Sequence, residues 1–291
     1  MAQPSATISF PSTSITTFQE HLAGSTRILA ILGAGLSASS GLSTFQGVGG
    51  DNLGYIRDRK KYAKPEAFAK HPDRVWCLYQ EQRRKALAAQ PNAAHVAIAK
   101  LATMLGGEVF MAVSVNIDGL GARAGHPPAQ LLEIQGSLFD IKCSDKSCEY
   151  VDKDTFDPDF VRTAPTPMDL QKCPKCSAFL HPSVARIDPN ISTDIASAAD
   201  AFIARSEHND LVLVLGTTAQ IWPASEYFHA PVTKGARIAM VSIDRGFQIP
   251  RDRTPYGGEL GLTHQDWLFL GDPAHIVPDM LKPVVGELQI T

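Results

Sequence analysis

The sequence predicts an α/β protein in which a doubly wound domain with a parallel sheet carries a small metal-binding module. Three observations predict this fold: short apolar runs recur along the chain, helical patterns lie between them, and four of the five cysteines fall within one 34-residue stretch. With 291 residues and a mass of 31.4 kDa, the chain has room for one large domain and an inserted module, or for two domains.

The overall composition is that of a globular protein. Hydrophobic residues make up 44% and charged residues 20%, which is enough apolar material for a sizeable core and excludes disorder for most of the chain. The net charge of -3 creates no field that would attract nucleic acid or an anionic membrane, so we expect neither as a partner. No apolar run approaches the roughly 18 to 20 residues of a membrane span. Because residues 1–25 lack a signal-peptide pattern, we expect an intracellular protein, cytoplasmic or nuclear.

Four uninterrupted apolar runs predict the strands of the sheet. They lie at residues 27–32, 109–115, 211–215 and 237–242, and runs of this length are typical of parallel strands buried on both faces. Helical patterns cover residues 73–90, 92–105 and 193–208, the last opened by Ser192 and Thr193 as candidate caps. Strands that alternate with helices predict a doubly wound sheet.

The first run ends in a glycine-rich turn, Gly33-Ala-Gly-Leu-Ser-Ala38. Gly33 permits a tight turn, Gly35 lets a diphosphate approach the backbone, and Ala38 keeps the following helix close to the sheet, so that free N–H groups face the anion. No second strand with an acidic end follows about 20 residues later, and residues 44–51 instead predict a glycine-rich loop over the nucleotide. The alternative is an ordinary turn of an α/β sheet.

The cysteines predict a metal site. Cys143 and Cys148 form one short-spaced pair, and Cys173 and Cys176 form the next after 24 residues, a pattern that suits tetrahedral thiolate coordination of Zn²⁺. Four thiolates leave no open position, so the zinc would be structural. It would supply the stability that so small a module cannot obtain from its own core. The alternative is reduced cysteines without metal.

Polar side chains follow two of the predicted strands. Asn116 and Asp118 come directly after the run at 109–115, and residues 133–137 follow the next strand. Open α/β sheets bind ligands at the carboxyl ends of their strands, which makes these residues candidates for a ligand site. Loop caps at the sheet edge are the alternative.

Taken in order, these motifs resemble the sirtuin family from about residue 28 to residue 281. The desuccinylase-type class of short sirtuins is most similar, and residues 123–127 resemble fungal members. The resemblance implies a sirtuin-like inverted Rossmann domain, a small zinc-ribbon domain, and NAD or ADP-ribose bound between them. We assign residues 1–25 to an N-terminal tail and helix start, 26–141 and 190–291 to the NAD-binding domain, and 142–189 to the zinc module. The motifs that carry the resemblance are Gly33 to Gly47, Pro91-Asn92 with His95, Asn116-Ile-Asp118, Gly136-Ser-Leu-Phe139, the four cysteines, Gly216-Thr-Thr218 and Gly271-Asp272.

The resemblance also implies roles for single residues. Asn116 and Asp118 would line the nicotinamide pocket, and Ser242 replaces the usual Asn near the adenosine ribose. The implied diphosphate residues are Gly33, Ala34, Gly35 and Ser37, and the further implied cofactor contacts are Phe45, Gln46, Val115, Gln135, Gly216, Thr217 and Thr218.

Several positions depart from the family pattern around the reaction centre. Gln135 stands where the family has its catalytic His, Gln46 replaces the loop Arg, Ser43 replaces a Pro, and Val115 replaces a Gln. In the family mechanism the acyl-lysine oxygen attacks ribose C1′ as nicotinamide leaves, and the His then deprotonates a ribose hydroxyl. A glutamine amide cannot accept that proton, and losing a general base typically removes about 10²–10⁴ in rate.

The peptide groove departs as well. Val184-Ala-Arg-Ile-Asp-Pro189 replaces the family's Val-Val-Trp-Phe-Gly-Glu, so Pro189 lacks an N–H for strand pairing and Arg186 puts a charge where an aromatic wall is expected. Gln82 takes the place of the Arg that binds succinyl groups in the Tyr-x-x-Arg motif, although Arg83 and Arg84 follow.

Three hypotheses follow from these departures. The first is an enzyme repurposed for a small anionic substrate, with Arg186 steering it and Asp188, His181 or Glu133 transferring protons; a peptide substrate is then doubtful. The second is a pseudoenzyme that binds NAD or ADP-ribose. The third is an NAD-dependent protein lysine deacylase of altered activity. The candidate catalytic residues are Gln135, Asn116, Asp118, Arg186 and Asp188.

Overall fold

The larger of two sheets carries the predicted parallel strands. The computed structural model describes residues 11–44, 61–157, 160, 166–187, 193–205, 210–217, 224–243 and 262–288. Six strands pair in parallel in the order β3-β2-β1-β7-β8-β9. Their bounds are β1 Ile28–Leu32, β2 Phe110–Ser114, β3 Leu131–Glu133, β7 Leu211–Leu215, β8 Arg237–Ser242 and β9 Trp267–Leu270. The α/β class and the four predicted strands are confirmed.

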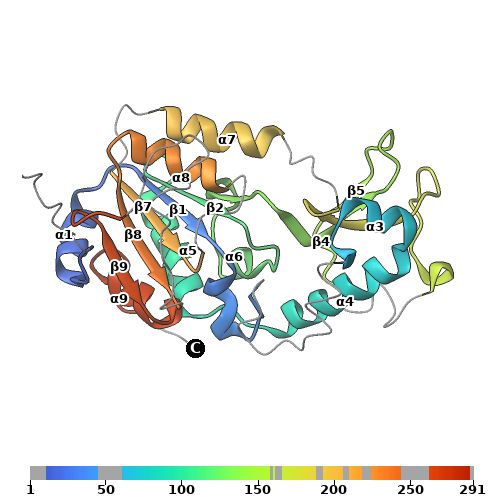
Figure 1. Ribbon diagram of the computed structural model, residues 1–291, viewed down its shortest axis with the longest axis horizontal. Helices are drawn as coiled ribbons and strands as arrows, with labels where there is room; N and C mark the ends of the chain where they lie inside the picture. Colours follow the sequence, from blue (N-terminus) through green and yellow to red (C-terminus); the bar gives the residue numbers. More distant parts are fainter. Residues whose placement is uncertain are drawn as a thin grey trace, which may run out of the picture.

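Helices cover both faces of this sheet (Figure 1). α1 Ile15–Gly24, α5 Ala93–Leu105 and α9 Pro273–Val285 share one core with the face that carries Ala30 and Leu32. α7 Thr193–Ala204 and α8 Ala224–Thr233 pack on the opposite face, with Leu29 and Ile31. Successive side chains of a strand point to opposite faces of the sheet. Because both faces are covered by helices, each strand needs apolar side chains at every position. This requirement explains why the strands appear in the sequence as uninterrupted apolar runs.

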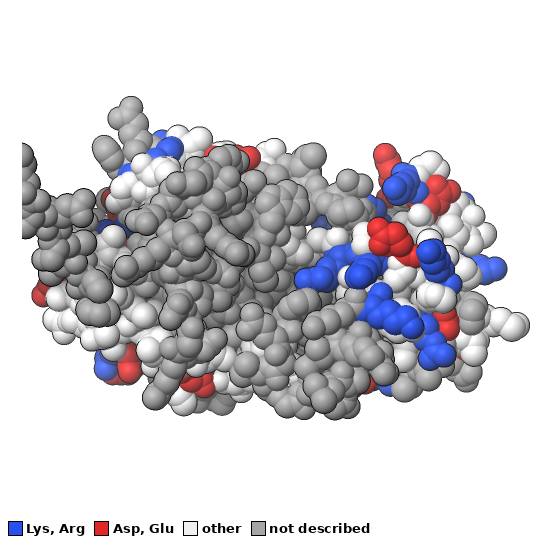
Figure 2. All heavy atoms as spheres, in the orientation of Figure 1, with Lys and Arg blue, Asp and Glu red and all other residues white. Residues whose placement is uncertain are grey.

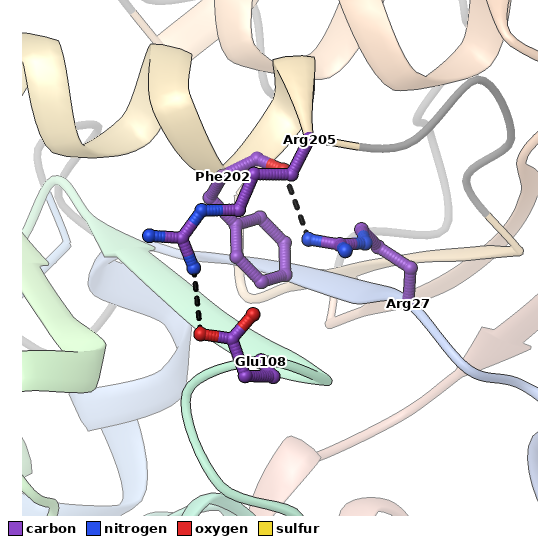
Figure 3. Close-up of polar contacts among 4 residues, drawn as sticks. All are labelled: Arg27, Glu108, Phe202 and Arg205. Carbon is purple, nitrogen blue, oxygen red and sulfur yellow. Dashed lines mark hydrogen bonds and ion pairs between the residues drawn. The ribbon is translucent and has the colours of Figure 1, made fainter.

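Two polar contacts fix the C-terminal end of α7 against the segments that precede β1 and β2 (Figure 3). Arg27, which precedes β1, donates to the backbone carbonyl of Phe202 over 3.2 Å and lies 4.9 Å from the centre of the Phe202 ring. Arg205 pairs with Glu108 at 2.8 Å, with both side chains largely exposed. Because exposed ion pairs contribute little, the partly buried contact of Arg27 with the Phe202 carbonyl is the stronger anchor.

A second, three-stranded sheet forms a separate lobe with two helices (Figure 1). β4 Gly136–Cys143 pairs antiparallel with β5 Val151–Asp152 and with β6 Leu180–Val184, while α3 Pro65–Lys70 and α4 Pro72–Ala88 share its core. The Trp76 indole of α4 donates to Leu180 O over 2.7 Å. The boundaries at residues 142 and 189 stay a prediction, and the packing shows that α3 and α4 belong to the core of this lobe.

Arg83 is the central polar contact of the lobe. Its side chain is 0% exposed and donates to Leu138 O and Thr155 O, both over 2.5 Å. The guanidinium also lies 5.4 Å from the ring centres of Phe139 and Phe160. Burial lowers the pKa of Arg83 to about 10, so it remains a cation at neutral pH. It therefore joins α4 to β4 and to the segment after β5.

No helix in the described part of the chain is long and apolar enough to cross a bilayer.

Arg83→Met should destabilise the protein by about 3 kcal/mol, because the carbonyls of Leu138 and Thr155 lose a charged donor in a buried environment. Urea unfolding measures the change. Arg74→Met is the matched control on the same helix, since Arg74 is 66% exposed and should change stability by less than about 0.5 kcal/mol. Equal effects of the two substitutions would contradict the assignment.

Candidate functional site

The site lies at the point in the sheet where the order of strand addition reverses, between β1 and β7. β1 and β7 are the two central strands. From β1 the chain adds β2 and β3 on one side, and from β7 it adds β8 and β9 on the other. The loops that leave β1 and β7 therefore diverge at the carboxyl edge, and such a switch point is where open α/β sheets bind ligands. Three segments meet there: the 3-10 helix η1 Ala34–Ser40, the loop between β2 and α6 Leu120–Arg123, and residues 216–217 after β7.

The turn after β1 presses against the turn after β7. Gly35 N donates to Gly216 O over 2.8 Å, and Gly33 N donates to Leu215 O over 3.0 Å. A Cβ atom on Gly35 would lie 2.8 Å from Gly216 O, and one on Gly33 would lie 2.4 Å from the Cβ of Thr217. Only glycine permits this approach without displacing backbone.

This contact gives the two glycines a role inside the protein. The N–H groups of Gly33 and Gly35 are both donated to carbonyls, so neither points to a ligand in this structure. In this structure the two N–H groups take part in a packing contact between two loops. That Gly33, Ala34, Gly35, Ser37, Gly216 and Thr217 surround a bound nucleotide stays a prediction.

A chain of hydrogen bonds links α5, η1 and the loop after β2. Asn92 N donates to His95 Nδ1 over 3.3 Å, His95 Nε2 lies 3.3 Å from Ser37 Oγ, and the Ser37 hydroxyl donates to Asp118 Oδ2 over 2.7 Å. The Asn116 amide donates to Gly33 O over 3.1 Å. The predicted residues Ser37, Asn116 and Asp118 are therefore brought together.

His95 is neutral in this chain. Burial lowers its pKa to about 4, although Asp118 acts in the opposite direction. Because Nδ1 accepts from Asn92, the neutral ring carries its proton on Nε2 and donates it to Ser37 Oγ. Sequence reasoning left His95 out of the site. The signal was its spacing three residues after Asn92, which forms a capping box at the start of α5.

Asp272 ties the C-terminal helix to the same edge. Its carboxylate accepts a short hydrogen bond from Ser39 of η1 and caps α9 by accepting from Ala274 N over 2.9 Å. One side chain therefore fixes both the end of η1 and the start of α9.

The remaining predicted residues occupy several places. Gln135 follows β3, and its carbonyl accepts from Ala185 N over 2.9 Å. Val115 follows β2 and packs against the core under α7 and α8. Ser242 ends β8 at the carboxyl edge, and its carbonyl accepts from Gly271 N over 2.8 Å. Arg186 is exposed after β6. The predicted residues Phe45, Gln46, Asp188 and Thr218 lie outside the described residues.

The four cysteines converge on one point of the small lobe. The four Sγ atoms all lie within 4.8 Å of one another, with Cys143 and Cys176 at 3.4 Å and Cys148 and Cys173 at 3.7 Å. Zn–S bonds of about 2.3 Å in a tetrahedron place the sulfurs about 3.8 Å apart. The sulfurs of Cys143, Cys148, Cys173 and Cys176 therefore fit a structural zinc ion.

The switch-point site together with the four-cysteine lobe defines a class of dinucleotide-binding α/β proteins with a structural zinc module. The chain matches the Sir2 family over residues 33–223. An NAD-dependent protein deacylase of Candida albicans is 32% identical, covering 93% of this chain and 98% of that protein. The NAD-dependent protein deacylase sirtuin-5 of Danio rerio, a mitochondrial protein, is 33% identical over 87% of this chain and 86% of its own.

Solved structures agree. A mutant Sir2 homologue in complex with ADP-ribose superposes with a TM-score of 0.73 at 28% identity, covering 92% of this chain and 95% of that one. A Sir2 homologue in complex with NAD gives 0.71 at 27% identity, covering 94% and 96%. This chain belongs to the Sir2 family, which confirms the resemblance.

Gly35→Ala should destabilise the protein by about 2 kcal/mol, because the new Cβ would push the Gly216 backbone away. Thermal unfolding measures the change. Gly24→Ala is the control, since no atom lies within 4 Å of a Cβ there. A Gly35→Ala protein as stable as the Gly24→Ala protein would contradict the loop contact.

One zinc ion per chain is expected at the cysteine cluster. Elemental analysis of purified protein should find about one equivalent, and Cys173→Ser should lower the zinc content and the melting temperature together. Cys77→Ser should change neither, because Cys77 lies on α4 outside the cluster. A structure with disulfides among the four cysteines would count against the site.

Proposed function

We propose that this protein is an NAD-dependent deacylase-type enzyme that has kept nicotinamide release and performs the later acyl-transfer step slowly. The hydrogen-bonded chain of His95, Ser37 and Asp118, with Asn116 beside it, carries this proposal. These side chains are preorganised at the carboxyl edge of the sheet, where the resemblance implies the nicotinamide pocket.

The geometry supports the first step. Asp118 accepts from the Ser37 hydroxyl through Oδ2 and, over 2.9 Å, from Leu120 N through Oδ1, so both of its oxygens are held in place. A fixed carboxylate favours the positive charge that develops on the ribose as nicotinamide leaves. The Asn116 amide donates to Gly33 O and lies beside the hydrogen-bonded chain that ends at Asp118. The relatives that cover most of this chain are named NAD-dependent protein deacylases, which supports the same reaction class.

The acyl group is a separate question. Gln82 takes the position of the succinyl-binding Arg, and Arg83 is committed to backbone carbonyls inside the small lobe. Arg83 is therefore unavailable to an acyl carboxylate. We infer that the enzyme prefers uncharged acyl groups over dicarboxylic ones.

A small anionic substrate is the second candidate, and the charge of the small lobe favours it. Figure 2 shows Lys and Arg side chains gathered over this lobe, with Asp and Glu side chains among them. Basic side chains of this kind attract anions. The exposed basic residues of the lobe are Lys61, Lys64, Lys70, Arg74, Lys146, Lys153, Lys172, Lys175 and Arg186.

Nicotinamide release tests the proposal. Incubation with NAD and an acetyl-lysine peptide should give net nicotinamide release at a rate well below that of ordinary sirtuins, because the slow acyl-transfer step limits each turnover. Asp118→Asn should abolish this release. Gln135→His should recover little deacylation, because the groove residues 185–189, with Pro189, remain changed. Chromatography of nicotinamide and of the deacylated peptide measures both.

The outcomes separate the three hypotheses. Tight NAD binding without any release would favour the pseudoenzyme. Release that depends on a small anion and not on the peptide would favour the repurposed enzyme. Brisk deacylation by the unmodified protein or after Gln135→His alone would show that the argument from Gln135 and the groove is wrong.

A further inference from the structure

Glu133 ends β3 beside the loop between β2 and α6, which carries Asn116 and Asp118. It pairs in register with Ser114 of β2, directly before the segment that carries Asn116 and Asp118. Leu132 and Ile134 belong to the core under α7 and α8, so Glu133 points to the opposite face of the sheet, the face of Ser37 and His95. Glu133 also precedes Gln135 by two residues, which places the two Cα atoms within about 7 Å.

Within the described residues, the charged groups that shift the pKa of Glu133 are all acidic. They come from three elements: Asp118 from the loop after β2, Asp140 from β4, and Asp154 from the segment after β5. Burial, and then these three carboxylates, raise the pKa of Glu133 to about 7. A carboxyl group with this pKa exchanges protons near neutral pH, whereas an ordinary surface Glu is fully ionised there.

Other proton acceptors near the site are already committed. His95 uses both ring nitrogens in the chain from Asn92 to Ser37, and Asp118 accepts through both oxygens. His181 lies 5% exposed in the small sheet, with Nδ1 2.9 Å from Pro182 O and its ring against Phe68.

Glu133 differs from these groups. Its carboxylate takes no hydrogen bond from any residue in the described part of the chain, so its lone pairs are not engaged there. It is thus the acidic group of the site that is both close to the position of the missing His and open to a proton.

We propose that Glu133 is the general base of the acyl-transfer step. In that step the O–H bond of a ribose hydroxyl breaks and its oxygen bonds to the carbon of the imidate that would link the acyl oxygen to ribose C1′. The π electron pair of the imidate C=N bond moves to the lysine nitrogen, and the proton passes through one water to the Glu133 carboxylate. The water spans the extra distance that separates Glu133 from position 135. The proposal rests on the proposed NAD-dependent deacylation, since it assigns the base of that reaction.

Two rates separate this role from a structural one. Exchange of labelled nicotinamide into NAD, in the presence of an acetyl-lysine peptide, reports the first step and needs no base. Formation of the acyl-ADP-ribose product needs the base. Both rates are measured between about pH 5 and pH 9.

Glu133→Gln should leave exchange within about twofold of the unmodified protein and lower product formation about 10²-fold. In the unmodified protein the product rate should rise with pH through about 7, because the base acts only when ionised, and this rise should vanish in Glu133→Gln. Asp140→Asn should shift the rise to lower pH, since one neighbouring negative charge is removed. Glu108→Gln, a surface control at the far edge of the sheet, should change neither rate.

A rescue variant makes the test stricter. Adding Gln135→His to Glu133→Gln should return product formation to the unmodified level, because the imidazole supplies a base at the family position. Persistence of the pH rise in Glu133→Gln, or an equal loss of exchange and product together with a lower melting temperature, would overturn the proposal. If the unmodified protein shows neither exchange nor product, the proposed function itself fails, and with it the need for a base.

Discussion

The close approach of two glycine turns determines how the site is built. The 2.8 Å hydrogen bond from Gly35 to Gly216 closes the gap between the loops that leave the central strands β1 and β7. With a side chain at either position the loops would separate, and η1 would move with the first of them. Ser37 lies on η1, so the distance from Ser37 to Asp118 depends on this backbone contact. A packing constraint at the centre of the sheet therefore sets the geometry of polar groups at its edge.

Two carboxyl groups of the site, those of Asp118 and Glu133, lie in different surroundings and suit different steps of the proposed reaction. The chain from His95 to Asp118 is hydrogen-bonded throughout and fixes the position of the Asp118 carboxyl group, which suits stabilisation of a developing cation. Gln135, at the position where the resemblance implies a catalytic His, carries an amide without basicity. Glu133, with three carboxylate neighbours, has the opposite properties: its carboxylate accepts no hydrogen bond from the described residues, and its pKa is raised. Charge stabilisation and proton transfer thus require different surroundings for two carboxylates of one site.

Most of the fold could be predicted because local chemistry determined it. Apolar runs at β1, β2, β7 and β8 predicted a sheet buried on both faces, and the spacing of the cysteines predicted the zinc lobe. The sequence could not show that α4 packs on the small sheet, since its apolar stripe fits any core. It also could not show that the N–H groups of Gly33 and Gly35 are donated to the neighbouring turn, because that depends on residues about 180 positions away. His95 was missed for a similar reason: its partner Ser37 lies on a different element.

The pairing of β1 with β7 has a consequence for how the chain folds. Ile28 pairs with Leu211, so one edge of the central strand stays open during synthesis until residue 211 has left the ribosome. At about 5–20 residues per second, this interval lasts on the order of 10 to 40 seconds. During it, a flat apolar strand edge is exposed to other chains. The nascent protein should therefore depend on chaperones, and fragments that stop before β7 should aggregate even though most of their helices can form.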